Sequence, residues 1–435
     1  MAGVLGGETI FAVASGAGRA AIAVVRASGP GCGVALAALC GGLPAARRAS
    51  LRTLRDGAGA VLDRALVLWL PGPGSFTGED SLELHVHGGR AVLEAVAGAL
   101  VALGLRPAEP GEFTRRAFLN GRMDLLEAEA VADLIDAETT AQRSQALRQM
   151  EGGLGVVLAG WRGRLVRVLA QQEALIDFPD EDLPAEVEAE LVAAVAGLAG
   201  EMRRHLDDNR RGERLREGLT IAVVGPPNAG KSTLINALSE RDVAIVADLP
   251  GTTRDVLEAR MEIAGAPVTL LDTAGLRESD DPVEAEGVRR ARLRAAAADL
   301  MVVAEAPGEM PLAGLPAHGR VLRVGTKADL GGGAAGVDVA VSARTGAGMA
   351  ALREALATHV RALTQAEGPP PLTRARHRAA LEEAAASLDR ALEAPHPELR
   401  GEDLRLALRA LGRLTGQVGV EDILDSVFRQ FCIGK

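Results

Sequence analysis

The chain has 435 residues, enough for two to four domains, and a formal net charge of −10, which argues against binding nucleic acid alone over a large basic surface. Its three cysteines, Cys32, Cys40 and Cys432, lack the spacing of a zinc site or a disulfide framework, as is usual in a reducing cytosol. The sequence shows no secretion signal and no apolar run of membrane-spanning length. We therefore expect a soluble, cytoplasmic protein that does not bind membranes.

The first part of the chain has the pattern of a mixed α/β domain, which we expect to cover residues 1–119. Its predicted strands are residues 9–13, 20–25, 65–69 and 81–86. Its predicted helices are residues 33–39 and 90–103. His85 and His87 share one face of a predicted strand. No third ligand is near them in the sequence, so ordinary polar side chains are the better interpretation than a metal site.

Residues 120–216 have a helical pattern. Apolar residues recur at helical spacing in three stretches, residues 124–150, 161–176 and about 185–216. The second helix should end at residues 177–179, where aspartate and proline interrupt the pattern.

The sequence GPPNAGKS at residues 225–232 matches the phosphate-binding P-loop pattern in full. It follows an apolar strand, residues 219–224, and precedes a helix that starts near residue 233, which is the context a P-loop needs. The glycines let backbone N–H groups converge on phosphate oxygens, and the helix N-terminus adds a partial positive charge. We therefore expect Lys231 to reach the outer phosphates and Ser232 to bind Mg²⁺.

Three further motifs, in the expected order, predict that the nucleotide is GTP. Residues 249–255 can supply a threonine, Thr253, to Mg²⁺, and Asp272 ends an apolar strand where a second-shell magnesium ligand is usual. Asp329, in the sequence TKAD, can accept both donor nitrogens of the guanine edge, and residues 342–344 can place a backbone N–H on the guanine oxygen. The expected GTP contacts are Asn228, Ala229, Gly230, Lys231, Ser232, Thr233, Ala247, Asp248, Leu249, Pro250, Gly251, Thr252, Thr253, Asp272, Thr273, Ala274, Gly275, Thr326, Lys327, Asp329, Ser342, Ala343 and Arg344.

Three consecutive prolines, residues 369–371, predict a stiff linker after the nucleotide-binding domain. Helical patterns then resume at residues 374–393, 401–411 and 421–431. The two flanking helical segments, residues 120–216 and 372–435, are each modest alone. We therefore expect one helical bundle with a GTPase domain, residues 217–371, inserted into it.

The three-part layout and a set of further motifs resemble the MnmE/TrmE family of tRNA-modification GTPases. The motifs are PGPGSFTGED at 71–80, HGG at 87–89, PGEFT at 110–114, RAFLN at 116–120, AVADLID at 130–136, DFPD at 177–180, GTTRD at 251–255 and FCIGK at 431–435. The resemblance covers essentially the whole chain.

The resemblance implies a fold class and a reaction. The fold would combine an α/β tetrahydrofolate-binding domain that forms a homodimer, a discontinuous all-α bundle and an inserted Ras-like P-loop GTPase domain. A flavoprotein partner, MnmG (also called GidA), would carry FAD, form a heterotetramer with this chain and hold most of the tRNA. Together they would add an aminomethyl or carboxymethylaminomethyl group to C5 of the wobble uridine of certain tRNAs. The carbon would come from a 5,10-methylene- or 5-formyl-tetrahydrofolate.

The resemblance also implies a folate site. Arg26, Glu83, Arg122 and Lys435 match the family's folate-contacting positions. Arg122 stands where relatives often have lysine, so its geometry there is a point of difference.

The resemblance implies a mechanism for GTP hydrolysis as well. Leu276 occupies the position at which many small GTPases carry a water-orienting glutamine. In the family a potassium ion replaces the arginine finger, and Glu284 matches the glutamate that orients water. The expected potassium ligands are Asn228, Ala247, Leu249 and Thr252. Without the family, Asn228 would be a P-loop spacer and Glu284 a solvated charge.

Three positions leave questions open. Thr326 replaces the usual asparagine of the base-recognition motif, so we expect altered affinity with retained guanine specificity. Arg344 replaces a frequent lysine, which should matter little because the backbone makes the contact. Cys432 lies in a tail that reaches the folate site in the family. The sequence allows either a chemical role for its thiol or none, and CIGK is a poor prenylation signal.

A different class of function is a GTP-switched ribosome assembly factor. Such proteins usually carry a basic RNA-binding module beside the nucleotide domain, and the sequence shows none.

Overall fold

The computed structural model describes residues 7–16, 18–177, 185–239, 258–272, 293–309, 318–331, 336–365, 368–418, 424, 427–429, 431 and 434. The chain forms two compact units, Met1–Ala132 with Gly412–Lys435, and Asp133–Leu411. Within the described ranges, no helix combines the length and the apolar character needed to cross a membrane.

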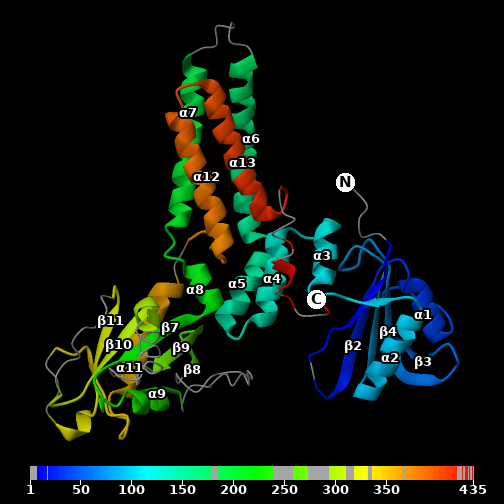
Figure 1. Cartoon of the computed structure of the whole chain (residues 1–435), viewed down its shortest axis with the longest axis horizontal. Helices are drawn as coiled ribbons and strands as arrows, with labels where there is room; N and C mark the ends of the chain where they lie inside the picture. Colours follow the sequence, from blue (N-terminus) through cyan, green and yellow to red (C-terminus); the bar gives the residue numbers. More distant parts are fainter. Residues whose placement is uncertain are drawn as a thin grey trace, which may run out of the picture. The chain divides into compact units, whose positions relative to one another are not determined.

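The first unit is built around a six-stranded sheet in the order β3-β4-β5-β2-β1-β6 (Figure 1). Its strands are β1 Ile10–Val13, β2 Ala20–Ser28, β3 Ser50–Arg55, β4 Val61–Leu70, β5 Ser81–Gly88 and β6 Arg106–Pro107. Neighbours are antiparallel except β1 and β6, which are parallel. The helices are α1 Cys32–Cys40, α2 Arg90–Ala102, α3 Glu112–Leu119 and α4 Leu125–Asp136, the last belonging to this unit up to Ala132. The sequence did not predict β3, β6 or α3.

One face of this sheet packs on α1 and α2 and the other is partly open. Inward-facing Val25, Val67 and Leu84 are at most 1% exposed. On the opposite face, Leu51 and Leu66 are cross-strand partners and are 61% and 39% exposed. At the other end of that face, Phe113 of α3 packs on Ile10 and Ala12 of β1.

Described residues near the C-terminus pack onto the same unit. Phe428 and Phe431 share a hydrophobic cluster with Leu125. A Cβ at Gly111, whose φ is +68°, would lie 2.7 Å from the Phe428 carbonyl oxygen. A Cβ at Gly434 would lie 2.7 Å from the Val13 carbonyl oxygen. The tail therefore reaches the end of β1.

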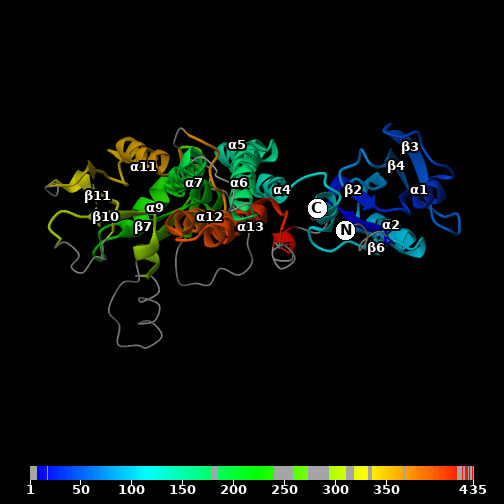
Figure 2. The ribbon, with the colours of Figure 1, turned by 90° about the horizontal axis from the view of Figure 1, so that it is seen from above.

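The second unit contains a bundle of long helices and a second sheet (Figures 1 and 2). Its α-helices include α5 Thr140–Met150, α6 Gly153–Asp177, α7 Ala185–Leu206, α8 Arg211–Glu217, α9 Lys231–Ser239, α11 Met349–Thr364, α12 Ala375–Glu393 and α13 Pro397–Thr415. The last helix, α13, belongs to this unit up to Leu411. The helices α6, α7, α12 and α13 lie side by side in both views. The predicted helix at residues 421–431 lies mostly outside the described residues.

Two of the helices predicted from the sequence are interrupted, so those two predictions were wrong. The stretch 124–150 forms α4 and α5, because Thr139 begins α5 with a capping box to Gln142. The stretch 185–216 forms α7 and α8, because Asn209 and Arg210 between them adopt φ of +55° and +54°. The sequence carries a signal for each break, the Thr-x-x-Gln capping pattern at residues 139–142 and the lack of apolar side chains at residues 207–214, and apolar spacing alone includes neither.

The second sheet has the order β12-β11-β10-β7-β9-β8. Its strands are β7 Leu219–Val224, β8 Glu258–Ile263, β9 Ala266–Asp272, β10 Leu300–Glu305, β11 Val321–Gly325 and β12 Val339–Ala340, with a short 3-10 turn η1 at Ala328–Leu330. Only the β8–β9 pair is antiparallel. In such sheets ligands bind beyond the carboxyl ends of the parallel strands.

At the amino ends of β7 and β9 lies a structure that we call the junction: residues 206–217 and 368–378, with α5 and Asp133. A Cβ at Gly212 of α8 would lie 2.4 Å from the Leu372 carbonyl oxygen, so the two connecting segments touch backbone to backbone. Asp133 Oδ1 accepts hydrogen bonds from Arg216 Nε at 2.8 Å and Arg374 Nη2 at 2.6 Å. One carboxylate oxygen therefore joins the segment that enters the sheet to the segment that leaves it.

Glutamines of α5 and a buried arginine complete the junction. Gln145 donates to the Gly212 carbonyl at 3.0 Å, and Gln149 accepts from Thr373 Oγ1 at 2.9 Å. Arg378, 6% exposed, donates to Glu213 Oε1 at 2.7 Å and to Asp208 and the Leu206 carbonyl. The centre of the junction is therefore a buried network of polar contacts.

Candidate nucleotide-binding site

The loop after β7 is shaped by close backbone packing. The strand LTIAVV is buried at its centre between β9 and β10. A Cβ at Gly225 would lie 2.3 Å from the Ala304 carbonyl oxygen of β10, so only glycine fits there. Asn228 and Gly230 both have positive φ, +65° and +83°. The loop therefore turns tightly into the N-terminus of α9.

Lys231 and Ser232 open α9 and face chemically suitable partners. Lys231, 7% exposed, donates from Nζ to the carbonyls of Gly225 and Pro226, both at 2.9 Å. Ser232 Oγ donates to Asp272 Oδ2 at 2.5 Å, at the carboxyl end of β9. A hydroxyl and a carboxylate at this distance, beside a helix N-terminus, are the oxygen donors that Mg²⁺ prefers. These residues therefore fit a magnesium ion bound with phosphates.

A cavity of about 380 Å³ lies beside the P-loop. Its lining residues come from α9, the segment after β11 and the segment after β12: Gly230, Thr233, Leu234, Thr326, Lys327, Asp329, Leu330, Val341, Ser342, Ala343 and Arg344. Asp329 of the TKAD segment and Ser342 of the SAR segment are 13 positions apart in the sequence. The structure brings both segments to one wall of a pocket that is large enough for a purine base.

The threonine that replaces the usual asparagine connects this pocket to the P-loop. Thr326 Oγ1 donates to the Ala229 carbonyl at 2.6 Å and approaches the Glu305 carbonyl at 3.2 Å. Thr326 is 5% exposed, so this bond is shielded from water. The hydroxyl therefore tethers the TKAD segment to the P-loop.

Asp329 is held in place by two side chains. Ser342 Oγ, completely buried, donates to Oδ1 at 2.6 Å, and Arg344 donates to Oδ2 from Nε at 3.1 Å and Nη2 at 2.7 Å. The hydrogen bond from Ser342 and then that from Arg344 lower the pKa of Asp329. The carboxylate is thus ionised and able to accept from a base edge. The sequence assigned Arg344 only a backbone contact.

Several predicted site residues lie outside the described residues. They are Ala247, Asp248, Leu249, Pro250, Gly251, Thr252, Thr253, Thr273, Ala274, Gly275, Leu276, Glu284, Cys432 and Lys435. The described predicted contacts, from Asn228 to Thr233, Asp272, and the TKAD and SAR residues, all lie at the carboxyl edge of one sheet.

A second candidate site lies in the first unit, around Arg26 of β2. The guanidinium carbon lies 4.6 Å from the centre of the Phe113 ring and 5.1 Å from that of Phe76. Arg26 and Glu83 are cross-strand partners on the partly open face. Burial lowers the pKa of Arg26, and the charge of Glu83 opposes that shift. Among the described residues, the Arg26 guanidinium contacts aromatic rings and has no hydrogen-bond acceptor, so its N–H groups can serve an anion.

The other predicted members of this second site are only partly placed. The Arg122 side chain packs on Gly78, where a Cβ would lie 3.3 Å from its Cγ and Cδ atoms. Glu83 Oε2 lies 3.3 Å from His85 Nε2, and His87 Nδ1 lies 2.8 Å from Asp63 Oδ1. The two histidines thus have carboxylate partners of their own. Lys435 lies outside the described residues, although Gly434 is beside β1.

Comparison with known proteins identifies the family. The family models that match are the MnmE helical domain, over residues 125–432, and the GTP-binding protein TrmE N-terminus, over residues 9–122. A tRNA modification GTPase MnmE of Gluconacetobacter diazotrophicus is 61% identical over 98% of both chains. The MnmE of Granulibacter bethesdensis is 57% identical over 98% of this chain and 99% of its own. The chain belongs to the MnmE family of tRNA modification GTPases. It is therefore a GTP-hydrolysing enzyme.

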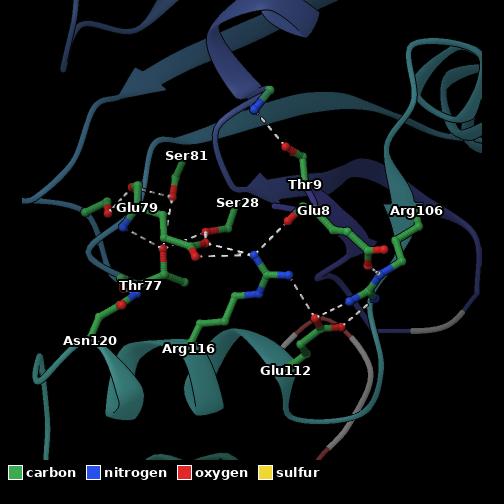
Figure 3. A network of polar contacts seen from close by, with 12 residues as sticks. Glu8, Thr9, Ser28, Thr77, Glu79, Ser81, Arg106, Glu112, Arg116 and Asn120 are labelled. Carbon is green, nitrogen blue, oxygen red and sulfur yellow. Dashed lines mark hydrogen bonds and ion pairs between the residues drawn. The ribbon is translucent and has the colours of Figure 1, made fainter. Parts of the chain in front are cut away.

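The MnmE-family motifs 71–80 and 116–120 meet in a buried ionic cluster that the sequence did not reveal (Figure 3). Arg116, whose side chain is 1% exposed, donates to Glu79 Oε2 at 3.0 Å and to Glu112 Oε1 at 3.0 Å. Ser28 Oγ donates to Glu79 at 2.7 Å, and Asn120 donates to the Thr77 carbonyl at 2.8 Å. The cluster fixes the loop that carries Phe76, which in turn lies over Arg26.

Sequence reasoning also missed Phe76 and Phe113 as parts of the second site. The chain has seven phenylalanines, two tryptophans and no tyrosine. Five of the seven phenylalanines lie in the family motifs quoted above, so their scarcity did not single out these two. Their convergence on Arg26 still required the fold, because β2, the loop before β5 and α3 are far apart in sequence.

Proposed function

We propose that this MnmE-family GTPase works with the FAD-containing partner MnmG to add an aminomethyl or carboxymethylaminomethyl group to C5 of the wobble uridine of certain tRNAs. The observation that carries this finer proposal is the contact of Arg26, at a folate-contacting position of the family, with the rings of Phe76 and Phe113. A cation with aromatic neighbours suits an anionic, flat pteridine ligand. Family membership favours this reaction over ribosome assembly.

In the nucleotide site each described side chain has one task. Asp329 accepts the donors of the guanine edge, and Thr326 keeps that edge in register with the P-loop through Ala229. Lys231 exchanges its bonds to P-loop carbonyls for phosphate oxygens and offsets their charge. Ser232 and Asp272, with Thr253, would hold Mg²⁺, which when bound neutralises charge on the phosphate oxygens.

Potassium-dependent association of two nucleotide domains is part of the proposal. Asn228, with Ala247, Leu249 and Thr252, would bind K⁺, and Glu284 would orient water. Asn228 is exposed and has a positive φ, so its side chain projects from the loop. Replacing it by alanine would remove the amide but also strain the backbone, whereas glycine accepts this φ.

We therefore expect Asn228→Gly to lose the preference for potassium and most of the hydrolysis rate, with GDP affinity nearly unchanged. Steady-state rates in potassium and in sodium chloride measure this. Retention of the full potassium stimulation in Asn228→Gly would show that the amide is not a ligand.

The folate site would use Arg26 and Arg122 for the ligand's carboxylates or ring oxygens, Glu83 for its donors and Lys435 from the tail. Gly434 beside Val13 supports a tail that reaches this unit. The homodimer is supported by the partly open sheet face with exposed Leu51 and Leu66, an apolar surface that a second copy would cover. The heterotetramer with MnmG, and tRNA held mainly by MnmG, complete the proposal, consistent with the acidic net charge.

Two measurements test this function. Mass spectrometry of tRNA nucleosides from a deletion strain should show the C5 modification restored by the wild-type chain and not by Arg26→Ala. Calorimetry with 5-formyltetrahydrofolate should show binding to the full chain and weaker binding to Arg26→Ala. Arg90→Ala is the control, since Arg90 is also an arginine of the first unit but pairs with Glu94 on α2, which packs on the opposite face of the sheet. Normal tRNA modification by Arg26→Ala would remove the role assigned to this site.

A further inference from the structure

The carboxylate of Asp329 already accepts three hydrogen bonds from the protein. Ser342 Oγ donates to Oδ1, and Nε and Nη2 of Arg344 both donate to Oδ2. Ser342 is fully buried, whereas the Arg344 side chain is 78% exposed and Asp329 only 15%. Ser342 is thus a fixed partner, and Arg344 is one that can leave.

A count of acceptor positions limits what Asp329 can bind at once. A carboxylate offers about four lone-pair positions, of which three are in use. The guanine edge presents two donors, the ring N1–H and the exocyclic amino group, and both need this carboxylate. The three existing hydrogen bonds and the two from guanine together exceed the acceptor positions of Asp329, so Arg344 must give up at least one bond when guanine binds.

We propose that Arg344 is an intramolecular competitor for the guanine-reading carboxylate. It pairs with Asp329 when the base is absent and is displaced, wholly or in part, when guanine binds. Arg344 then determines how strongly the pocket distinguishes guanine from purines that offer fewer donors. This role belongs to the side chain of Arg344, in addition to any contact of the segment's backbone with the base.

Hypoxanthine provides the decisive comparison, because it keeps the N1–H donor and lacks the amino group. One donor and the three existing bonds fill about four positions, so Arg344 can keep its pair when an inosine nucleotide binds. The Arg344–Asp329 pair therefore weakens the binding of GDP but not that of inosine diphosphate. Removing Arg344 should increase the preference for GDP rather than change both affinities alike.

The size of the effect follows from the exposure of the pair. Ion pairs between exposed side chains contribute little, so we expect a change of about two- to five-fold in the ratio of the two dissociation constants. Salt screens such pairs, so the change should shrink at about 1 M salt. Loss of a positive charge from the pocket affects the binding of both negatively charged nucleotides and cancels in the ratio.

The experiment measures dissociation constants of GDP and inosine diphosphate by calorimetry for the full-length wild type and variants. Arg344→Gln should raise the ratio of the inosine to the guanine dissociation constant by about two- to five-fold at low salt. Arg344→Lys, which keeps the charge but not the two-pronged geometry, should give an intermediate ratio.

Arg323→Gln is the matched control. Arg323 donates to Glu305 Oε1 from Nε at 3.1 Å and Nη2 at 2.7 Å, the same two distances as in the Arg344 pair, and neither residue lines the cavity. Its ratio should equal that of the wild type. An unchanged or lower ratio for Arg344→Gln, or an equal rise for Arg323→Gln, would overturn the proposal.

Discussion

The core of the nucleotide-binding sheet and the junction at the amino ends of β7 and β9 both contain side chains that are almost completely buried, but those of the core are apolar and those of the junction are polar or charged. Ile221 and Leu270 of the core are at most 1% exposed and pack among aliphatic side chains. Thr373, His377 and Arg378 of the junction are at most 6% exposed and are polar or charged. These side chains are shielded from water in both regions, but only the junction depends on the direction of each hydrogen bond.

This difference explains what each region can specify. Apolar burial is non-directional, so a core tolerates small shifts provided that its volume stays filled. A buried polar group that loses its partner keeps the full cost of leaving water. The junction therefore fixes how the connecting segments meet α5, while the core mainly holds the sheet together.

The largest effect should come from the core. Leu270→Ala in β9 removes a completely buried side chain and should lower the free energy of unfolding of the nucleotide-binding part by about 3 kcal/mol. Chemical denaturation followed by loss of GDP binding measures it. Leu293→Ala makes the same change at a residue that is 57% exposed and should cost less than about 0.5 kcal/mol. Similar losses for the two would contradict the assignment of the core.

The next effect tests the junction. Asp133→Ala leaves Arg216 and Arg374 without a shared carboxylate, and we expect a loss of about 2–3 kcal/mol, since the Asp133 side chain is 12% exposed. Asp136→Ala, an exposed aspartate on the same helix, is the control.

Hydrogen exchange separates the two regions. In Asp133→Ala, amides of residues 206–217 and 368–374 should exchange faster while those of β7 and β9 stay protected. In Leu270→Ala the strands should lose protection. Uniform loss of protection in both variants would mean that core and junction are one cooperative structure.

Two glycines give a smaller effect with opposite signs. Gly212→Ala would place a methyl group 2.4 Å from the Leu372 carbonyl oxygen, and we expect a loss of about 1–3 kcal/mol. Gly197→Ala in α7 meets nothing within 4 Å and should gain up to about 1 kcal/mol through helix propensity. Thermal unfolding measures both, and a stabilised Gly212→Ala would show that the segments are not in backbone contact.

The smallest effect is a pH dependence from His205, at the end of α7 next to the junction. Burial lowers the pKa of His205, with Asp208 raising it and Arg211 and Arg378 lowering it. The unfolded chain takes up a proton near pH 6.5 while the folded imidazole, edge-on to Trp161, stays neutral. Stability should therefore fall as pH decreases below about 6.5, by less than about 1.4 kcal/mol per pH unit. His205→Gln should remove this component, and an unchanged slope in denaturation at pH 7, 6 and 5 would refute it.

The sequence predicted those parts of the molecule whose structure is determined by residues close together in the chain. The P-loop, its strand and its helix follow from consecutive residues, because strand period, glycine positions and helix start are local properties. The TKAD and SAR segments, which line one cavity in the structure, were recognisable for the same reason. The helix breaks at Thr139 and Asn209 were not found, because the spacing of apolar residues includes neither the capping pattern at 139–142 nor the polar stretch at 207–214.

The sequence by itself determined the family, the order of the nucleotide motifs and most elements, because these are recorded in short, contiguous patterns. Only the tertiary structure decided which distant side chains meet. Asp133 pairs with arginines 83 and 241 residues away, and Arg26 lies between Phe76 and Phe113. The engagement of Asp329 by Arg344 likewise depends on the packing of β11 against β12. Ion pairs and ring contacts are set by distance in space, and no local pattern in the chain encodes that distance.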